Sequence, residues 1–171
     1  MSAFDPTFAG DSSFHAEWIV RLLAAIACGA LIGIDRELKE RPAGLRTHAL
    51  VSMSAAAFTI LCGTLFARVY RYEDVTEPDF LRIIEGVIAG VAFLGAGSII
   101  QGRRGVAGLT TGAGIWAAGA AGLACGVQLY GFAALISVLA FMLLAVATLI
   151  ERILPKKKVP DPVVPDPTVP G

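Results

Sequence analysis

Long apolar runs alternate with short polar connectors along most of this chain. Each run holds roughly 17 to 22 residues, close to the 20 or so that a helix needs to cross the hydrocarbon layer of a membrane. The runs also lack the polar stripe of a soluble amphipathic helix. We therefore predict an all-α integral membrane protein, a bundle of about five transmembrane helices over residues 18–34, 47–67, 80–100, 109–127 and 129–150.

The two ends of the chain depart from this pattern. Residues 1–17 are polar and weakly patterned, whereas residues 155–171 contain Val-Pro-Asp-Pro twice and show no hydrophobic periodicity. Repeated prolines favour an extended chain that builds no core. We therefore expect a short extracytoplasmic N-terminal arm (1–17), a transmembrane domain (18–154) and a Pro-rich disordered cytoplasmic tail (155–171). A docking site for a proline-binding partner is the alternative for the tail.

Composition supports the membrane assignment. Of the 171 residues, 56% are hydrophobic and 16% are charged, whereas an ordinary soluble domain has about 45–50% apolar and about 25% charged residues. The formal net charge is zero and no basic face is present, which argues against nucleic-acid binding. We find no nucleophile–base pair, metal-ligand cluster or cofactor fingerprint in the sequence, so we expect no enzyme and no cofactor.

The distribution of basic residues predicts an orientation. Ten lysines and arginines lie in the connector after the first run, the turn after the third and the flank after the fifth, against four on the other side. Cytoplasmic loops carry the excess of Lys and Arg in membrane proteins. The N-terminus is therefore expected outside and the C-terminus inside.

Glycines recur at four-residue spacing within the predicted helices. Small residues on one helix face let backbones approach closely in lipid, where packing rather than hydrophobic burial drives association. The pattern favours a tightly packed bundle. The alternative is that the glycines form an oligomer interface or line a thin-walled permeation path. The packing candidates are Gly29, Gly33, Gly86, Gly90, Gly95, Gly97, Gly108, Gly112, Gly122 and Gly126.

Three segments resemble the signatures of a known family. The segment GALIGIDRELKERPAGLRTHALV (residues 29–51) resembles the first signature of the MgtC/SapB membrane proteins, and GVAFLGAGSII (90–100) with GVAGLTTGAGIWAAGAAGLACG (105–126) resembles the second. The resemblance implies a multi-pass protein of the bacterial cytoplasmic (inner) membrane, linked to magnesium limitation and in some members to virulence. Longer members carry a soluble C-terminal domain, so we expect a short form without it.

Three positions depart from the family pattern. Asp35 stands where the family usually shows Glu, and Glu85 stands where an uncharged amide or small residue is expected. Thr110 stands where the family member associated with magnesium stress has Asn. The first change retains a carboxylate on a shorter stem.

The connector after the first run concentrates the charge of the transmembrane domain. Magnesium prefers hard oxygen ligands, usually one or two carboxylates with water, but arginines beside Asp35 would neutralise a cation site. We therefore expect an ion-paired clamp joining two helix ends, with gating or partner docking as the alternative. His48 is expected to be an interfacial hydrogen-bonding residue, with a proton relay as the alternative. The clamp residues are Asp35, Arg36, Glu37, Arg41, Arg46, Thr47 and His48.

Glu85 is the candidate intramembrane acid. A carboxylate in a spanning segment is costly and suggests a function with a nearby partner. Arg82, three residues earlier, is the expected ion-pair partner, and a cation-binding role for Glu85 at an outer vestibule is the alternative. Glu85 is thus our one speculative metal ligand.

The start of the fourth run combines basic residues with hydroxyls. Helix N-termini attract anions, so Arg103, Arg104, Thr110 and Thr111 form a possible site for a lipid phosphate. Simple N-capping by one of the threonines is the alternative.

Two functions remain open from the sequence. The first is a regulatory or accessory protein of magnesium homeostasis that works through membrane partners. The second is a small oligomeric transporter or channel with Mg²⁺ as ligand or substrate. The expected partners are the lipid bilayer and other membrane proteins or further copies of the chain.

Overall fold

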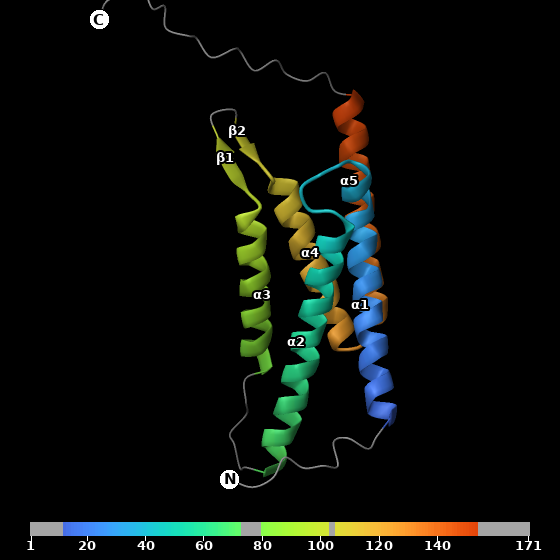
Figure 1. Cartoon of the computed structure of the whole chain (residues 1–171), viewed down its shortest axis with the longest axis vertical. Helices are drawn as coiled ribbons and strands as arrows, with labels where there is room; N and C mark the ends of the chain where they lie inside the picture. Colours follow the sequence, from blue (N-terminus) through green and yellow to red (C-terminus); the bar gives the residue numbers. More distant parts are fainter. Residues whose placement is uncertain (1–11, 73–79, 103–104, 154–171) are drawn as a thin grey trace, which may run out of the picture.

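A computed structural model describes residues 12–72, 80–102 and 105–153. They form five helices and one hairpin, and each helix runs antiparallel to the one before it (Figure 1). The elements in chain order are α1 (Ser12–Leu38), α2 (Leu45–Tyr72), α3 (Phe80–Gly97), β1 (Ile100–Gly102), β2 (Gly105–Ala107), α4 (Leu109–Gly126) and α5 (Tyr130–Ile153).

Three helices are long and apolar enough to cross a membrane. The qualifying stretches are Ala16–Leu38, Leu45–Leu65 and Tyr130–Ile150, and Ile84–Gly97 is a shorter apolar helix. Large apolar side chains stay exposed on the outside of the bundle, for example Leu143 on α5, which a water-soluble protein would bury. The described residues thus confirm a mainly helical protein with five helices, three of them candidate membrane spans, and the prediction that all five cross the membrane stays a prediction.

Two boundaries differ from the predicted runs. Helix α1 begins at Ser12, so the last residues of the expected N-terminal arm are helical. The prediction that the third run is helical to Ile100 is wrong, because α3 ends at Gly97 and Ile100 pairs with Ala107 in an antiparallel hairpin. Gly105 and Gly108 have φ angles of 116° and 89°, a left-handed backbone that favours glycine and lets the chain reverse into α4. The disordered tail and most of the N-terminal arm lie outside the described residues.

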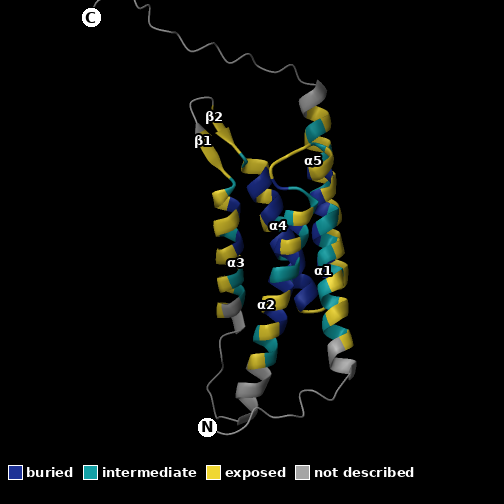
Figure 2. Ribbon diagram, in the orientation of Figure 1, coloured by how far each residue is buried: buried dark blue, intermediate teal, exposed yellow. Residues whose placement is uncertain are grey.

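Helix α4 lies at the centre of the bundle and contacts the other four helices. Figure 2 shows the buried residues concentrated along it, with exposed residues on the outer sides of α3 and α5. Small side chains make this position possible. A Cβ on Gly119 would lie 2.7 Å from Val91 of α3, and one on Gly126 would lie 2.6 Å from Thr59 of α2.

The predicted packing glycines fall into two groups. A Cβ on most of them would collide with a neighbouring helix or loop backbone or side chain; these are Gly29, Gly33, Gly95, Gly108, Gly112, Gly122 and Gly126. Gly86, Gly90 and Gly97 of α3 have no such neighbour within 4 Å. These three glycines are therefore not used for packing within one copy of the chain, whereas Gly95 of the same helix packs on Gly112 of α4.

Helices α1 and α4 each end in a turn with the same hydrogen-bonding pattern. At the end of α1, the Arg41 N–H donates to the Arg36 carbonyl at 3.0 Å, and Glu40 takes a left-handed φ of 50°. At the end of α4, the Leu129 N–H donates to the Ala124 carbonyl at 2.8 Å, and Gln128 has φ 65°. Both are Schellman-type C-caps with a non-glycine residue at the strained position.

Candidate functional site

A buried polar cluster joins α1 to α4 and α5 near the end of α1. It consists of Asp35, Arg36, Lys39, Thr111 and Thr148, and we call it the connector cluster. The Arg36 guanidinium donates to the Thr111 hydroxyl of α4. The Lys39 ammonium binds the Asp35 carboxylate and donates to the Thr148 hydroxyl of α5 at 2.6 Å. Three helices are therefore fastened by side chains from one turn of α1.

Burial makes these contacts strong. Asp35 and Arg36 are 7% and 6% exposed, and Thr111 is 2% exposed. Burying an ion without partners costs several kcal/mol, so removing one member of such a set is strongly destabilising. The sequence predicted an ion-paired clamp here, and in the structure Asp35 forms an ion pair with Lys39, which lies one helical turn away.

The connector also caps the next helix. The Glu37 carboxylate accepts the N–H of Leu45, the first residue of α2, at 2.9 Å. A negative group at a helix N-terminus satisfies an otherwise unpaired donor and interacts favourably with the helix dipole. A Cβ on Gly44 would meet the Glu37 carboxyl group, so a larger residue there would displace the side chain that caps α2. The connector thus fixes where α2 starts.

His48 is fully buried between α2 and α4. Its Nδ1 lies 2.8 Å from the Gly44 carbonyl, which can only accept, so Nδ1 carries the proton in a neutral ring. A Cβ on Gly114 would lie 2.7 Å from His48 Nε2, so α4 approaches the ring with bare backbone. Within the described residues, Nε2 and the hydroxyl of the fully buried Ser52 have no hydrogen-bond partner.

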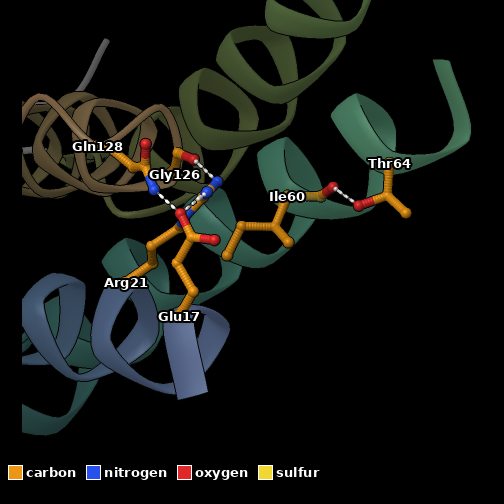
Figure 3. Close-up of polar contacts among 6 residues, drawn as sticks. All are labelled: Glu17, Arg21, Ile60, Thr64, Gly126 and Gln128. Carbon is orange, nitrogen blue, oxygen red and sulfur yellow. Dashed lines mark hydrogen bonds and ion pairs between the residues drawn. The ribbon is translucent and has the colours of Figure 1, made fainter. Parts of the chain in front are cut away.

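A second polar cluster lies at the opposite end of the bundle. Figure 3 shows Glu17 and Arg21 of α1 meeting the end of α4. Arg21 pairs with the Glu17 carboxylate at 2.5 Å and donates to the Gly126 carbonyl at 3.0 Å, and Gln128 donates to the same carboxylate. We call these four residues the outer cluster. A cation on a terminal carbonyl suits the negative end of the α4 dipole. Nearby, the Thr64 hydroxyl donates to its own helix at the Ile60 carbonyl, 2.8 Å away, and does not join this cluster.

The two clusters fix the register of α1 against α4. Arg36 contacts Thr111 and Arg21 contacts Gly126, so the contact points are 15 residues apart on each helix. A shift of α1 by one turn along α4 would break both contacts at once. Each arginine therefore fastens one end of the central helix.

Glu85 lies on the exposed side of α3, as does Arg82. Among the described residues, the structure contains no ion pair between them, although three residues on a helix bring such side chains within reach. Arg21, which enters the bundle from the same end, belongs to the outer cluster and pairs with Glu17. The carboxylate of Glu85 points away from the bundle rather than into it.

The remaining predicted residues are placed as follows. Arg41 and Arg46 are exposed, and Thr47 is half-buried in the first turn of α2. Capping of α4 by a threonine is wrong, because the N-cap is Gly108 and no side chain caps it. Thr110 is exposed and Thr111 is in the connector cluster, while Arg103 and Arg104 lie outside the described residues.

Sequence reasoning missed five residues of these clusters. Three of them take part in i,i+4 ion pairs: Lys39 pairs with Asp35, and Arg21 pairs with Glu17. That spacing was visible in the sequence and places both charges on one helix face. Thr148 and Gln128 gave no signal, because their partners are more than 100 residues away.

An apolar groove separates α2 from α3. It has a volume of about 660 Å³ and is lined by Leu50, Val51, Ser54, Ala55, Phe58 and Cys62 of α2 and by Gly86, Val87, Gly90, Val91 and Leu94 of α3. Helix α3 packs on α4 more than on α2, which leaves this groove open.

Comparisons with known proteins place the chain in context. Residues 22–153 match the model of the MgtC family. The chain is 43% identical to YhiD of Escherichia coli K12, whose name proposes magnesium transport, over 77% of this chain and 60% of that protein. It is 41% identical to the MgtC protein of Salmonella typhimurium over 64% of this chain and 43% of that protein. No solved structure is significantly similar. The chain thus spans about half the length of the curated relatives it matches.

Proposed function

Because this chain belongs to the MgtC family, we propose that it is a multi-pass protein of the bacterial cytoplasmic membrane with a regulatory or accessory role in magnesium homeostasis or magnesium-limitation stress. It acts through contacts with other membrane proteins. The link to magnesium rests on the family resemblance and on the name of the Escherichia coli relative. The family model matches residues 22–153, which contain most of the helical bundle, and we assign the role to this region.

The observation that carries the regulatory role is the connector cluster. Its buried carboxylate, Asp35, is held by the ammonium of Lys39, and the guanidinium of Arg36 follows in the chain. Within the connector cluster, the positive charges of Lys39 and Arg36 outnumber the negative charge of Asp35, so the cluster opposes the binding of a metal cation. The same side chains tie the end of α1, where the connector to α2 begins, to α4 and α5. A protein that binds the connector can therefore act on the whole bundle.

The proposed topology has five membrane crossings, with the N-terminus outside. Three helices are long and apolar enough for this, and α3 and α4 run between the same two ends of the bundle (Figure 1). The connector, the hairpin and the end of α5 share one end, where the sequence concentrates its basic residues. Alkaline phosphatase fused after residue 153 is expected to be inactive, and green fluorescent protein fused there is expected to fluoresce. The reverse result would overturn the orientation.

A magnesium transporter or channel is the second candidate. The name of the Escherichia coli relative favours it, and the exposed carboxylate of Glu85 offers an oxygen ligand on the outer half of α3. In a bilayer, an outward-facing carboxylate requires a partner or an aqueous surface. This candidate predicts that Glu85→Ala abolishes magnesium flux while the protein stays folded.

One experiment separates the two candidates. Purified protein is reconstituted into liposomes that hold a magnesium-sensitive dye, and magnesium entry is followed for wild type, Glu85→Ala and empty liposomes. We expect wild type and empty liposomes to be indistinguishable. In parallel, a bacterial strain lacking its own MgtC-family protein is grown at low magnesium, where we expect wild type to restore growth and Lys39→Met to fail. Saturable uptake that disappears in Glu85→Ala would establish transport instead.

A further inference from the structure

Helix α3 exposes a continuous face that carries two charges. Arg82, Glu85, Ala89, Phe93 and Ala96 follow one another at intervals of three or four residues, and all five are exposed. Such spacing places them on one side of a helix. We call this side the outer face of α3. The opposite side packs on α4, where Gly95 and Val91 meet Gly112 and Gly119.

The outer face combines features that lipid does not satisfy. Gly86, Gly90 and Gly97 border it with no neighbour within 4 Å of an added Cβ, so another backbone can approach closely. Gly86 and Gly90 also line the open groove between α2 and α3. The apolar stretch Ile84–Gly97 is also about 21 Å long at helical rise, shorter than a hydrocarbon layer of about 30 Å. Oligomerisation is one way in which short membrane helices compensate for such a mismatch.

We propose that α3 pairs through this outer face with the α3 of a second copy of the chain, related by a two-fold axis along the membrane normal. This inference rests on the membrane placement of α3 proposed above. In such a pair the helices are parallel, so equal residue numbers lie at equal depth. Arg82 of each copy then lies one helical turn from Glu85 of the other, and the long arginine side chain spans this offset of about 4.5 Å along the axis.

Charge complementarity selects a second copy over lipid or an unrelated helix. A two-fold axis makes the ion pair twice and leaves no charge of either sign unpaired, because each copy brings one Arg82 and one Glu85. Lipid tails offer no partner to Glu85, which lies within the apolar stretch Ile84–Gly97, whereas Arg82 lies just before that stretch. Phe93, 79% exposed, lies at the depth of Gly90 and Leu94 of the second copy, on the rim of its groove. The pair therefore covers the largest exposed side chain of α3 as well as its charges.

The decisive test uses two differently tagged chains. One carries Arg82→Glu, which makes its outer face doubly acidic, and the other carries Glu85→Arg, which makes it doubly basic. Each is expected to lose self-association in co-purification by more than tenfold, whereas the two expressed together are expected to co-purify as strongly as wild type. A pair within one chain cannot produce this rescue in trans. Failure of the mixture to associate, with both chains folded in the membrane, would overturn the proposal.

Two further variants guard against misfolding and chance contact. Ala89→Ile places bulk on the outer face and is expected to abolish association, whereas Ala134→Ile on the exposed side of α5 is expected to leave it unchanged. In a background without the native cysteines, Ala89→Cys is expected to form disulfide dimers upon oxidation, and Leu139→Cys on α5 is not. Equal dimer yields at both positions would overturn the proposal.

These experiments measure the association of chains and need no magnesium. They can therefore fail while the magnesium-linked role stands, and the reverse also holds. Association found only in native membranes and absent from purified protein would assign the face to a different partner and count against a second copy.

Discussion

Replacing Thr111 by Val tests whether the connector cluster stabilises the bundle. Valine keeps the shape of threonine and removes the hydroxyl that accepts from the Arg36 guanidinium. A hydrogen bond to a charged group contributes about 1.5–3 kcal/mol, and here both partners are at least nine-tenths buried. We therefore expect the free energy of unfolding to fall by about 1.5–3 kcal/mol, which is roughly a 10- to 150-fold change in the ratio of folded to unfolded protein.

The assay is unfolding by sodium dodecyl sulfate in mixed micelles, followed by the fluorescence of Trp18 and Trp116. Thr110→Val is the matched control, because this neighbouring threonine is exposed and outside the cluster. Thr111→Ser keeps the hydroxyl and should recover most of the loss. If Thr111→Val unfolds within about 0.5 kcal/mol of Thr110→Val, the contact adds no stability and the reasoning from burial is refuted.

Three further predictions concern backbone geometry and use the same unfolding assay. Gly122→Ala is expected to destabilise by about 1–3 kcal/mol, because its Cβ would collide with the backbone carbonyl of Ser52 in α2, whereas Gly131→Ala meets open space and should not destabilise. Equal effects at the two glycines would contradict the close approach of α2 and α4. Glu40→Gly is expected to stabilise by up to about 1 kcal/mol, because glycine adopts the observed φ of 50° without strain, and a loss of stability would show that the Glu40 side chain has its own role. Glu37→Ala is expected to cost about 0.5–2 kcal/mol through loss of the cap on Leu45, a loss that Glu37→Asp, with a shorter reach, should not fully repair.

The sequence predicted the helices well and the hairpin poorly. The apolar runs that became α2, α4 and α5 start and end within a few residues of the structure, because lipid leaves few alternatives to a helix over such a run. The hairpin was missed because Ile99 and Ile100 extend the apolar run of α3 past its real end. Only Gly102 and Gly105, two residues apart, marked a turn.

The candidate site was predictable in its location and less so in its contacts. Dense charge between two apolar runs marked the connector, and the i,i+4 position of Lys39 could have named the partner of Asp35. The orientation of Arg36 towards Thr111 depends on α4 lying beside α1, which no local pattern specifies. The outward direction of Glu85 likewise follows from how α3 packs on α4.

The register of α1 against α4 has a consequence for the surrounding lipid. Its two fastening arginines are 15 residues apart, which is about 22 Å along a helix, and the hydrocarbon layer of a bilayer is about 30 Å thick. Both side chains are held inward by α4, so they cannot reach far outward to compensate. In the membrane placement proposed above, the register of α1 against α4 would therefore be coupled to the acyl-chain length of the membrane, because a thicker bilayer draws the two held arginines towards its hydrocarbon layer. Lipid composition is thus a physical input to this bundle, independent of any ion.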